Sequence, residues 1–156
     1  MQLGRNALQV IPEEIGRLAS LKNLDISSNQ LAELPNSFSK LTELTSLKLS
    51  FNALETLPDT VSHLTKLIDL QLNRNKIQSL PESIHSLENL QYLDLSYNQL
   101  NTLPKSLFKS LRFIRNFKIQ GNPFAVEEIK HFRRWVHSEI STDFELALSS
   151  AERQEK

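Results

Sequence analysis

The chain has 156 residues, a length typical of one domain, and its 18 Lys and Arg balance its 18 Asp and Glu to a formal net charge of zero. This balance gives no electrostatic basis for binding nucleic acid or an anionic membrane surface. The absence of cysteine excludes disulfides and cysteine-based zinc or redox sites, and no apolar run approaches the roughly 20 residues of a membrane span.

A spacing of 23 residues recurs along the chain and explains its content of 28 leucines. Asparagine recurs at this step from Asn29 through Asn52 and Asn75 to Asn98. Partial units precede and follow four full units, and the last full unit is one residue longer, because Leu111 stands where residue 110 is expected. Such a repeat predicts a stack of similar coils with one shared core. Leucine and proline keep the same step at Leu21, Leu44, Leu67 and Leu90, and at Pro35, Pro58, Pro81 and Pro104.

The first partial unit is expected to place a strand edge at the beginning of the chain. Met1 falls at the second leucine position of that unit, so residues 1–4 form a strand with one unpaired edge. An open edge is a template for association. Three interpretations stay open: the chain is part of a longer protein, the edge is covered by self-association, or a short frayed edge is tolerated.

Each full unit alternates apolar and polar residues around its central leucines, which predicts a short strand. In one unit Leu47 and Leu49 face one side and Lys48 faces the other. The asparagine that follows, such as Asn52, is expected to turn the chain and to bond backbone groups of the neighbouring coil. Proline, such as Pro58, has a fixed φ and no N–H, so it suits the irregular outer side of each coil.

The consensus of these units, LxxLxLxxNxLxxLPxxIxxLxx, resembles the leucine-rich repeat family in its 23-residue class. The resemblance covers residues 1–124 and implies an α/β repeat solenoid, a right-handed coil with a short parallel sheet on its concave side. This class includes intracellular animal and plant scaffolds that engage small GTPases or phosphatases, and secreted repeat proteins of pathogenic bacteria such as leptospires. Membership does not identify the partner.

The periodicity changes after the last partial unit, and residues 125–156 are expected to form a C-terminal helical cap and a frayed tail. Apolar residues recur at helical spacing over residues 125–138. We expect this helix to lie across the last coil, with Phe124 and Trp135 covering its leucines. The chain thus divides into a solenoid, residues 1–124, and the cap.

A second short helix is expected further along. Thr142 and Glu145 fit a capping box, which favours a helix start before Leu146. From about residue 149 onward the chain is expected to fray.

No catalytic or metal-binding pattern is found in the sequence. The three glycines form no phosphate-binding loop, and no serine lies in a GxSxG pattern. His63 and His85 fall at neighbouring outer positions, where two exposed polar side chains are a simpler interpretation than a shared metal ion. Asp25 and Asp94 lie three coils apart, about 14 Å, which is too far for a glycosidase pair. We therefore expect no catalytic residue, no metal and no cofactor.

The outward strand positions form columns, one residue from each coil. In the column between the strand leucines, Asp25 can pair with Lys48, and Asp94 with Lys118, as exposed ion pairs of small energy. The next column is small and uncharged, which leaves room for a partner. Its members are Gly4, Ser27, Ser50, Asn73, Ser96 and Gln120.

The pre-asparagine column is the candidate site for a partner. There Phe51, Arg74 and Tyr97 fall on three successive coils, and Arg74 can stack between the two rings. Aromatic residues and Arg are enriched at interface hot spots. The alternative is a self-satisfied stack that only covers the sheet edge. The column comprises Arg5, Ser28, Phe51, Arg74, Tyr97 and Gly121, and the candidate partner-binding residues are Phe51, Arg74, Tyr97, Tyr92, Asp69, Lys48 and Asp94.

These features favour a non-enzymatic protein-interaction module, such as a signalling scaffold, that binds another protein on its concave face. The lack of cysteine favours a cytoplasmic location, because extracellular repeat proteins often have disulfide-bonded caps. The second hypothesis is a secreted or surface-exposed bacterial virulence protein that binds host proteins. An enzyme, or one half of an enzyme, is the third and least favoured hypothesis.

Overall fold

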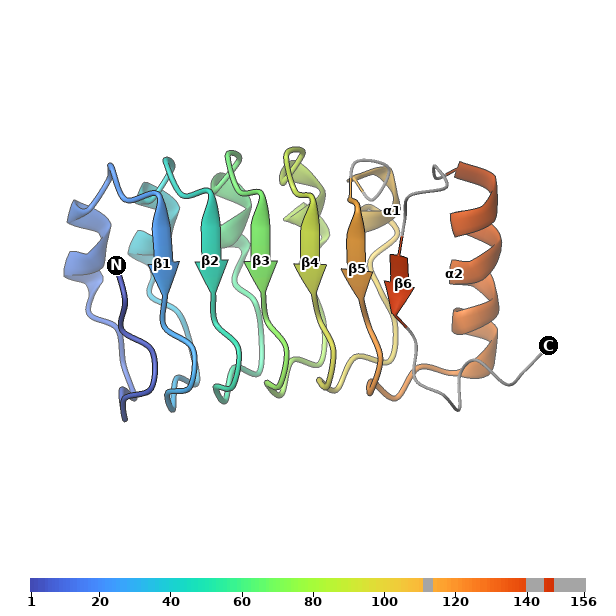
Figure 1. The fold of residues 1–156 in the computed structure, drawn as a ribbon, viewed down its shortest axis with the longest axis horizontal. Coiled ribbons are helices and arrows are strands. Elements are labelled where there is room, and N and C mark those ends of the chain that lie inside the picture. The colour runs from blue at the N-terminus through green and yellow to red at the C-terminus, as the bar shows by residue number, and fades with distance from the viewer. Residues whose placement is uncertain (111–113, 140–144, 148–156) are drawn as a thin grey trace.

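The computed structural model describes residues 1–110, 114–139 and 145–147 and shows a row of similar coils stacked side by side (Figure 1). Short strands on one side pair in parallel and form a six-stranded sheet in the order β1-β2-β3-β4-β5-β6. The strands are β1 (Asn23–Asp25), β2 (Ser46–Lys48), β3 (Asp69–Gln71), β4 (Tyr92–Asp94), β5 (Asn116–Lys118) and β6 (Glu145–Ala147).

The strand register follows the period of the sequence. Leu47 is paired with Leu24 on one side and with Leu70 on the other, steps of 23 residues. Between β4 and β5 the step is 24 residues, because Leu93 is paired with Phe117. The register therefore confirms both the period and the extra residue of the last full unit.

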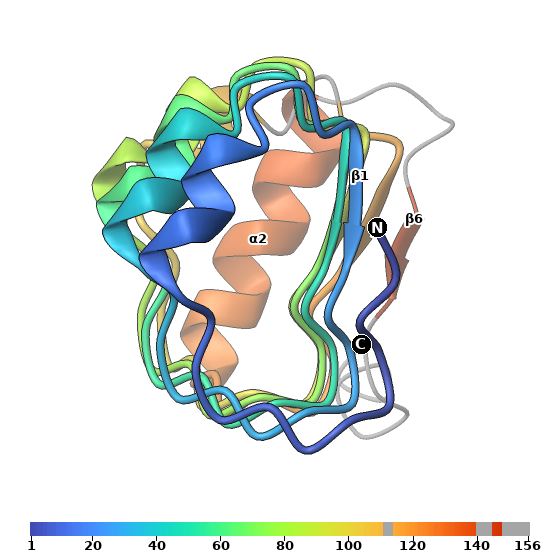
Figure 2. The same ribbon diagram turned by 90° about the vertical axis from the view of Figure 1, so that its left-hand side faces the viewer.

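Short helices form the wall opposite the sheet (Figure 2). Each 3-10 helix begins directly after a proline, as η2 does after Pro35, whose φ is −69°. A residue with a fixed φ and no N–H suits the position before a helix. The helices of this wall are η1 (Glu13–Arg17), η2 (Asn36–Lys40), η3 (Asp59–His63) and η4 (Glu82–Ser86), followed by α1 (Leu107–Ser110).

Leucine side chains fill the space between the two walls. Leu47, Leu70 and Leu93 from the strands are fully buried, and so are Leu41 and Leu64 from the outer side of the coils. The buried residues form one continuous cluster that runs along the stack. One coil alone buries too little apolar surface to offset the entropy of ordering its backbone, so each coil depends on its neighbours.

An asparagine ladder joins each coil to the one before it. Asn75 Oδ1 accepts a hydrogen bond from the backbone N–H of Leu54 at 3.0 Å, and its Nδ2 donates to the carbonyl oxygens of Leu49 and Leu72 at 3.0 and 2.9 Å. Among the described residues, the Asn6 amide, in the first coil of the row, donates hydrogen bonds only to carbonyl groups of its own coil. The expected role of the repeated asparagine is confirmed. Asn29, Asn52, Asn98 and Asn122 make the equivalent bonds.

The first residues extend the sheet beyond β1 on one side. Leu3 N–H donates to the carbonyl of Asp25 at 2.7 Å, and the Met1 amino group donates to the carbonyl of Asn23 at 2.7 Å. The opposite edge of residues 1–4 is unpaired within the described part of the chain, as expected.

At the other end, α2 (Val126–Glu139) closes the core (Figure 2). Its bounds agree with the helix expected over residues 125–138. Phe124 and Phe132 are buried, and their ring centroids lie 5.3 Å apart in an edge-to-face arrangement. The expected packing of Trp135 lies outside the side chains that the structure describes, and the boundary after residue 124 stays a prediction.

The second short helix expected after Thr142 is wrong for the residues that can be judged. Residues 145–147 form β6, in which Leu146 is paired with Phe117 of β5. The reason is that the outer edge of β5 carries backbone groups in need of partners, and a short parallel strand bonds them. Thr142 and the tail from residue 149 lie outside the described residues.

Replacement of Asn75 by alanine is expected to lower the free energy of unfolding by about 3 kcal/mol, because it leaves buried backbone groups of two coils without partners. Asn6→Ala is the matched control and should cost less than about 1 kcal/mol, since that side chain is exposed. Urea unfolding followed by circular dichroism measures both values, and equal losses would contradict the role assigned to the ladder.

Candidate protein-binding surface

The outward side of the sheet, here called the sheet face, carries the polar residues of each strand. Lys48 lies between the buried Leu47 and Leu49 and is half-buried on this face. The same alternation places Asp25, Gln71 and the other members of its column outward. The sheet face therefore holds the side chains that do not belong to the apolar core.

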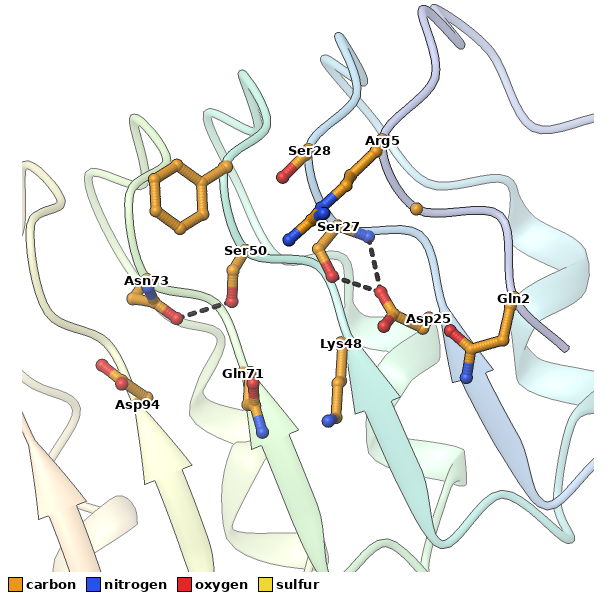
Figure 3. A pocket seen from close by; sticks show the side chains of 12 residues that line it. Gln2, Arg5, Asp25, Ser27, Ser28, Lys48, Ser50, Gln71, Asn73 and Asp94 are labelled. Atoms are coloured by element: carbon orange, nitrogen blue, oxygen red, sulfur yellow. Dashed lines mark hydrogen bonds between the residues drawn. The ribbon is translucent and has the colours of Figure 1, made fainter.

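A hollow of about 610 Å³ lies on the half of the sheet face that is nearer the N-terminus (Figure 3). The small residues Gly4, Ser27 and Ser50, which the sequence predicted to leave room for a partner, line it. Phe51 and Arg5, both from the pre-asparagine column, also line it. The remaining lining residues are Gln2, Asp25, Ser28, Lys48, Gln71, Asn73 and Asp94.

The Asp25 carboxylate is held by its own coil rather than by a salt bridge. It accepts hydrogen bonds from Ser27, from the backbone N–H at 2.9 Å and from the side-chain hydroxyl. Lys48 lies opposite in register, but no ion pair joins it to Asp25 among the described residues. Partial burial raises the pKa of Asp25, yet the Ser27 hydrogen bonds and the charges of Lys48 and Arg5 outweigh it and hold the pKa below its usual value.

Asp94 is the last residue of β4, as Lys48 is of β2, and it is buried. It accepts hydrogen bonds from Ser96 N–H at 3.0 Å and Ser96 Oγ at 2.6 Å. The expected pair with Lys118 is present, with Nζ and Oδ2 4.0 Å apart, but the expectation that it is exposed is wrong for Asp94, which is buried. Lys118 also lies 5.2 Å from the centre of the Tyr92 ring. Asp94 and Tyr92 thus belong to a satisfied polar cluster on the sheet.

Asp69 lies beside Tyr92 in register, as expected, but its carboxylate contacts other residues. It accepts hydrogen bonds from Ser46 Oγ at 3.0 Å and from Gln71 Nε2 at 3.2 Å. The structure therefore places Asp69, Tyr92 and Asp94 near one another across β3 and β4, with polar partners of their own.

Phe51, Arg74 and Tyr97 form a stack along the pre-asparagine column. The Arg74 guanidinium carbon lies 5.2 Å from the Phe51 ring centre and 4.5 Å from the Tyr97 ring centre. Phe51 and Tyr97 are 51% and 48% exposed, so the stack faces solvent. The expected arrangement of these three side chains is present, and they are neither scattered nor buried.

The backbone explains why these side chains line up. All five non-glycine residues of the column have left-handed φ values between 55° and 58°, a conformation that costs energy for residues with a Cβ. Their N–H groups offset this by bonding the next coil, as Phe51 does to Asn73 and Arg74 to Ser96. The column thus repeats at the strand spacing of about 4.8 Å, close to the separations within the stack.

Gly121 ends the stack, a role that the sequence reasoning did not assign to it. Its φ is +73°, and a Cβ placed there would lie 2.5 Å from Tyr97 Cδ1. Glycine therefore lets the Tyr97 ring lie against the backbone of the following coil. The signal for it was present, since glycine occupies the position of the column next to an aromatic residue.

The described residues include no group of three or more His, Asp or Glu side chains that could hold a metal ion. His63 and His85 are exposed, and Nδ1 of each lies beside a carbonyl oxygen of its own helix. Among the described helices, none combines the length and the apolar character that a bilayer crossing requires.

Asp25→Asn is expected to destabilise the chain near neutral pH and progressively less in acid. The folded-state pKa of Asp25 is depressed, so its charged form contributes stability above the unfolded-state pKa of about 3.9, and this contribution is lost as the pH falls through the folded-state pKa. Urea unfolding of both proteins between neutral and acidic pH measures the difference. Ser27→Ala removes one hydrogen-bond donor and should therefore raise the pKa of Asp25. A difference in stability between the original chain and Asp25→Asn that does not change with pH would contradict this role of Asp25.

Comparison with known proteins places this architecture in a family. The family profile described as "Leucine rich repeat" matches residues 1–54, 42–100 and 70–124. None of the curated proteins compared with the sequence matches it.

Three solved structures show how widely the architecture recurs. A leucine-rich repeat protein of Leptospira interrogans has a TM-score of 0.87 at 34% identity, over 94% of this chain and 36% of that one. A chain of the octameric complex of Latrophilin 3, Unc5D and FLRT2 has a TM-score of 0.79 at 27% identity, over 94% and 46%. The plant peptide hormone receptor RGFR1, in complex with RGF2, has a TM-score of 0.71 at 30% identity, over 80% and 20%.

The chain spans less than half the length of each of these three structures. Because the family profile covers all repeat units and the strands, register and asparagine bonds agree with it, the chain belongs to the leucine-rich repeat family, with the solenoid fold of that family.

Proposed function

We propose that the chain is a non-enzymatic module that binds another protein on its sheet face, with the Phe51–Arg74–Tyr97 stack at the centre of the contact. The observation that supports this proposal most is the exposure of two aromatic rings, about half of each, around one arginine. Leucine-rich repeat domains are commonly protein-interaction modules, and no residue of the stack is needed for the core. Trp, Tyr and Arg dominate the energetics of protein interfaces.

The stack has properties that suit an interface better than a structural role. Cation–π contacts at exposed sites contribute only about 0.5–1 kcal/mol, so the fold gains little from it. Burial of the two rings by a partner gains much more, because each ring buries a large apolar area at a low entropic cost. Packing of Arg74 between the rings fixes its side chain in advance, which reduces the entropy lost on binding.

A protein partner fits the charge distribution better than nucleic acid does. The chain has zero net charge, and Arg5 and Lys48 on the hollow are balanced by Asp25 and Asp94. The similar structures support the same choice, since RGFR1 is in complex with RGF2 and FLRT2 is part of an octameric complex. The sheet face of this chain is proposed to act in the same general way.

The cellular setting is a separate proposal. The absence of cysteine supports a cytoplasmic scaffold, and similarity to a leucine-rich repeat protein of Leptospira interrogans supports the secreted or surface-exposed bacterial alternative, in which host proteins are bound. The gene upstream of Met1 distinguishes the two, because a signal peptide there would favour the second.

The combined replacement Phe51→Ala, Arg74→Ala and Tyr97→Ala is expected to leave the fold intact and to weaken binding by more than 100-fold. The probes are peptides selected from a displayed library on the intact chain, and isothermal titration measures their affinity. Lys76→Ala with Gln99→Ala is the control, because these exposed side chains lie two residues further on in two of the same coils. Unchanged affinity in the triple variant would reject the site.

Self-association through the N-terminal edge is a second proposal. Besides the open edge of residues 1–4, Val10 and Leu18 are 68% and 40% exposed near the same end. Sedimentation equilibrium of the intact chain is expected to show a dimer, and Val10→Glu with Leu18→Glu should convert it to the 17.9 kDa monomer. A monomeric intact chain would reject this proposal.

A further inference from the structure

Phe51 is the one aromatic residue of the Phe51–Arg74–Tyr97 stack that also lines the hollow. Arg74 covers one side of the Phe51 ring at 5.2 Å. On the other side the preceding coil contributes Ser28 to the pre-asparagine column, and Ser28, Phe51 and Arg5 all line the hollow. The column thus has flat groups at three successive positions and only a hydroxymethyl group at the next.

We propose that the partner inserts an aromatic side chain above Ser28, against the face of Phe51 that Arg74 leaves uncovered. This inference rests on the proposed function and specifies the kind of side chain that the partner contributes. The position that this side chain would take is called the Ser28 subsite, and it is lined by Ser28, Phe51 and Arg5.

The spacing of the coils supports this assignment. Members of the column repeat at the strand spacing of about 4.8 Å, and stacked aromatic rings prefer centroid separations of about 4.5–7 Å. A ring one coil away from Phe51 therefore lies directly above Ser28, in continuation of the stack. A larger side chain at position 28 would fill this space, and serine leaves it free.

Arg5 provides the second wall of the subsite. Its side chain extends along the hollow toward Ser27 and Ser28 (Figure 3). No hydrogen bond or ion pair of the Arg5 guanidinium occurs among the residues that the structure describes. The guanidinium is therefore available to cover the second face of an inserted ring, as Arg74 covers Phe51.

The charges of the hollow favour an uncharged ring over an ionic group. Asp25 lies between Arg5 and Lys48 and stays ionised, so it repels a carboxylate that approaches either cation. An ammonium group that approaches Asp25 would be repelled by the charges of Arg5 and Lys48. An aromatic ring avoids both costs and gains from stacking, whereas an aliphatic side chain gains neither ring stacking nor a cation–π contact.

The test is a titration of the intact, ¹⁵N-labelled chain with N-acetyl-tryptophan amide and, separately, with N-acetyl-leucine amide, followed by NMR. We expect saturable shifts centred on Ser28 and Phe51, and an affinity for the tryptophan amide about two- to tenfold higher than for the leucine amide. Ser28→Trp fills the subsite and should abolish the shifts at Phe51. Ser62→Trp, on the helix wall, is the control and should leave them unchanged.

Phe51→Leu keeps an apolar side chain and removes the ring, so it should abolish the preference for the tryptophan amide even if Ser28→Trp fails to fold. Equal affinity for the two amides, shifts elsewhere on the sheet face, or no saturable shift would overturn the Ser28 subsite. Loss of selected peptides in the triple alanine variant but not in Ser28→Trp would overturn the subsite alone and leave the proposed function in place.

Discussion

The structure depends on hydrogen bonds between coils, and above all on those of the buried asparagine ladder. At the point where each coil turns out of the sheet, some buried backbone groups, such as the Leu54 N–H and the Leu72 carbonyl, are bonded by a side chain and not by a neighbouring strand. An amide with one acceptor and two donors, such as that of Asn75, replaces these partners on both sides of the turn. The turn can therefore be buried, and neighbouring coils keep the same separation along the whole row.

That constant separation determines what the surface can present. Side chains at equivalent positions come to lie in rows whose spacing suits the stacking of flat groups, and the Phe51–Arg74–Tyr97 stack is the clearest case. The recognition surface is thus a direct product of the packing that stabilises the core. No separate loop or insertion is required to build it.

Much of this architecture could be predicted from the sequence, because a 23-residue period carries long-range information within each short unit. The strands, their register, the asparagine bonds and the stacking of Arg74 between two rings all followed from it, and the cap helix followed from the helical spacing of apolar residues after the last unit. β6 could not be predicted, because three residues become a strand only through pairing with β5, and their local signal was that of a helix start. The partner of the Asp25 carboxylate could also not be predicted. It bonds to Ser27 and forms no ion pair with Lys48, and this depends on side-chain geometry that the sequence does not show.

The left-handed backbone of the pre-asparagine column has a consequence for how such a protein changes over time. The same φ is adopted by serine, arginine, phenylalanine and tyrosine, so the frame is indifferent to which of them occupies a given coil. Exchanging these side chains alters the sheet face without disturbing the apolar core. A few substitutions in this column are therefore enough to change which ligand the protein binds, while descendants of the gene keep the same fold.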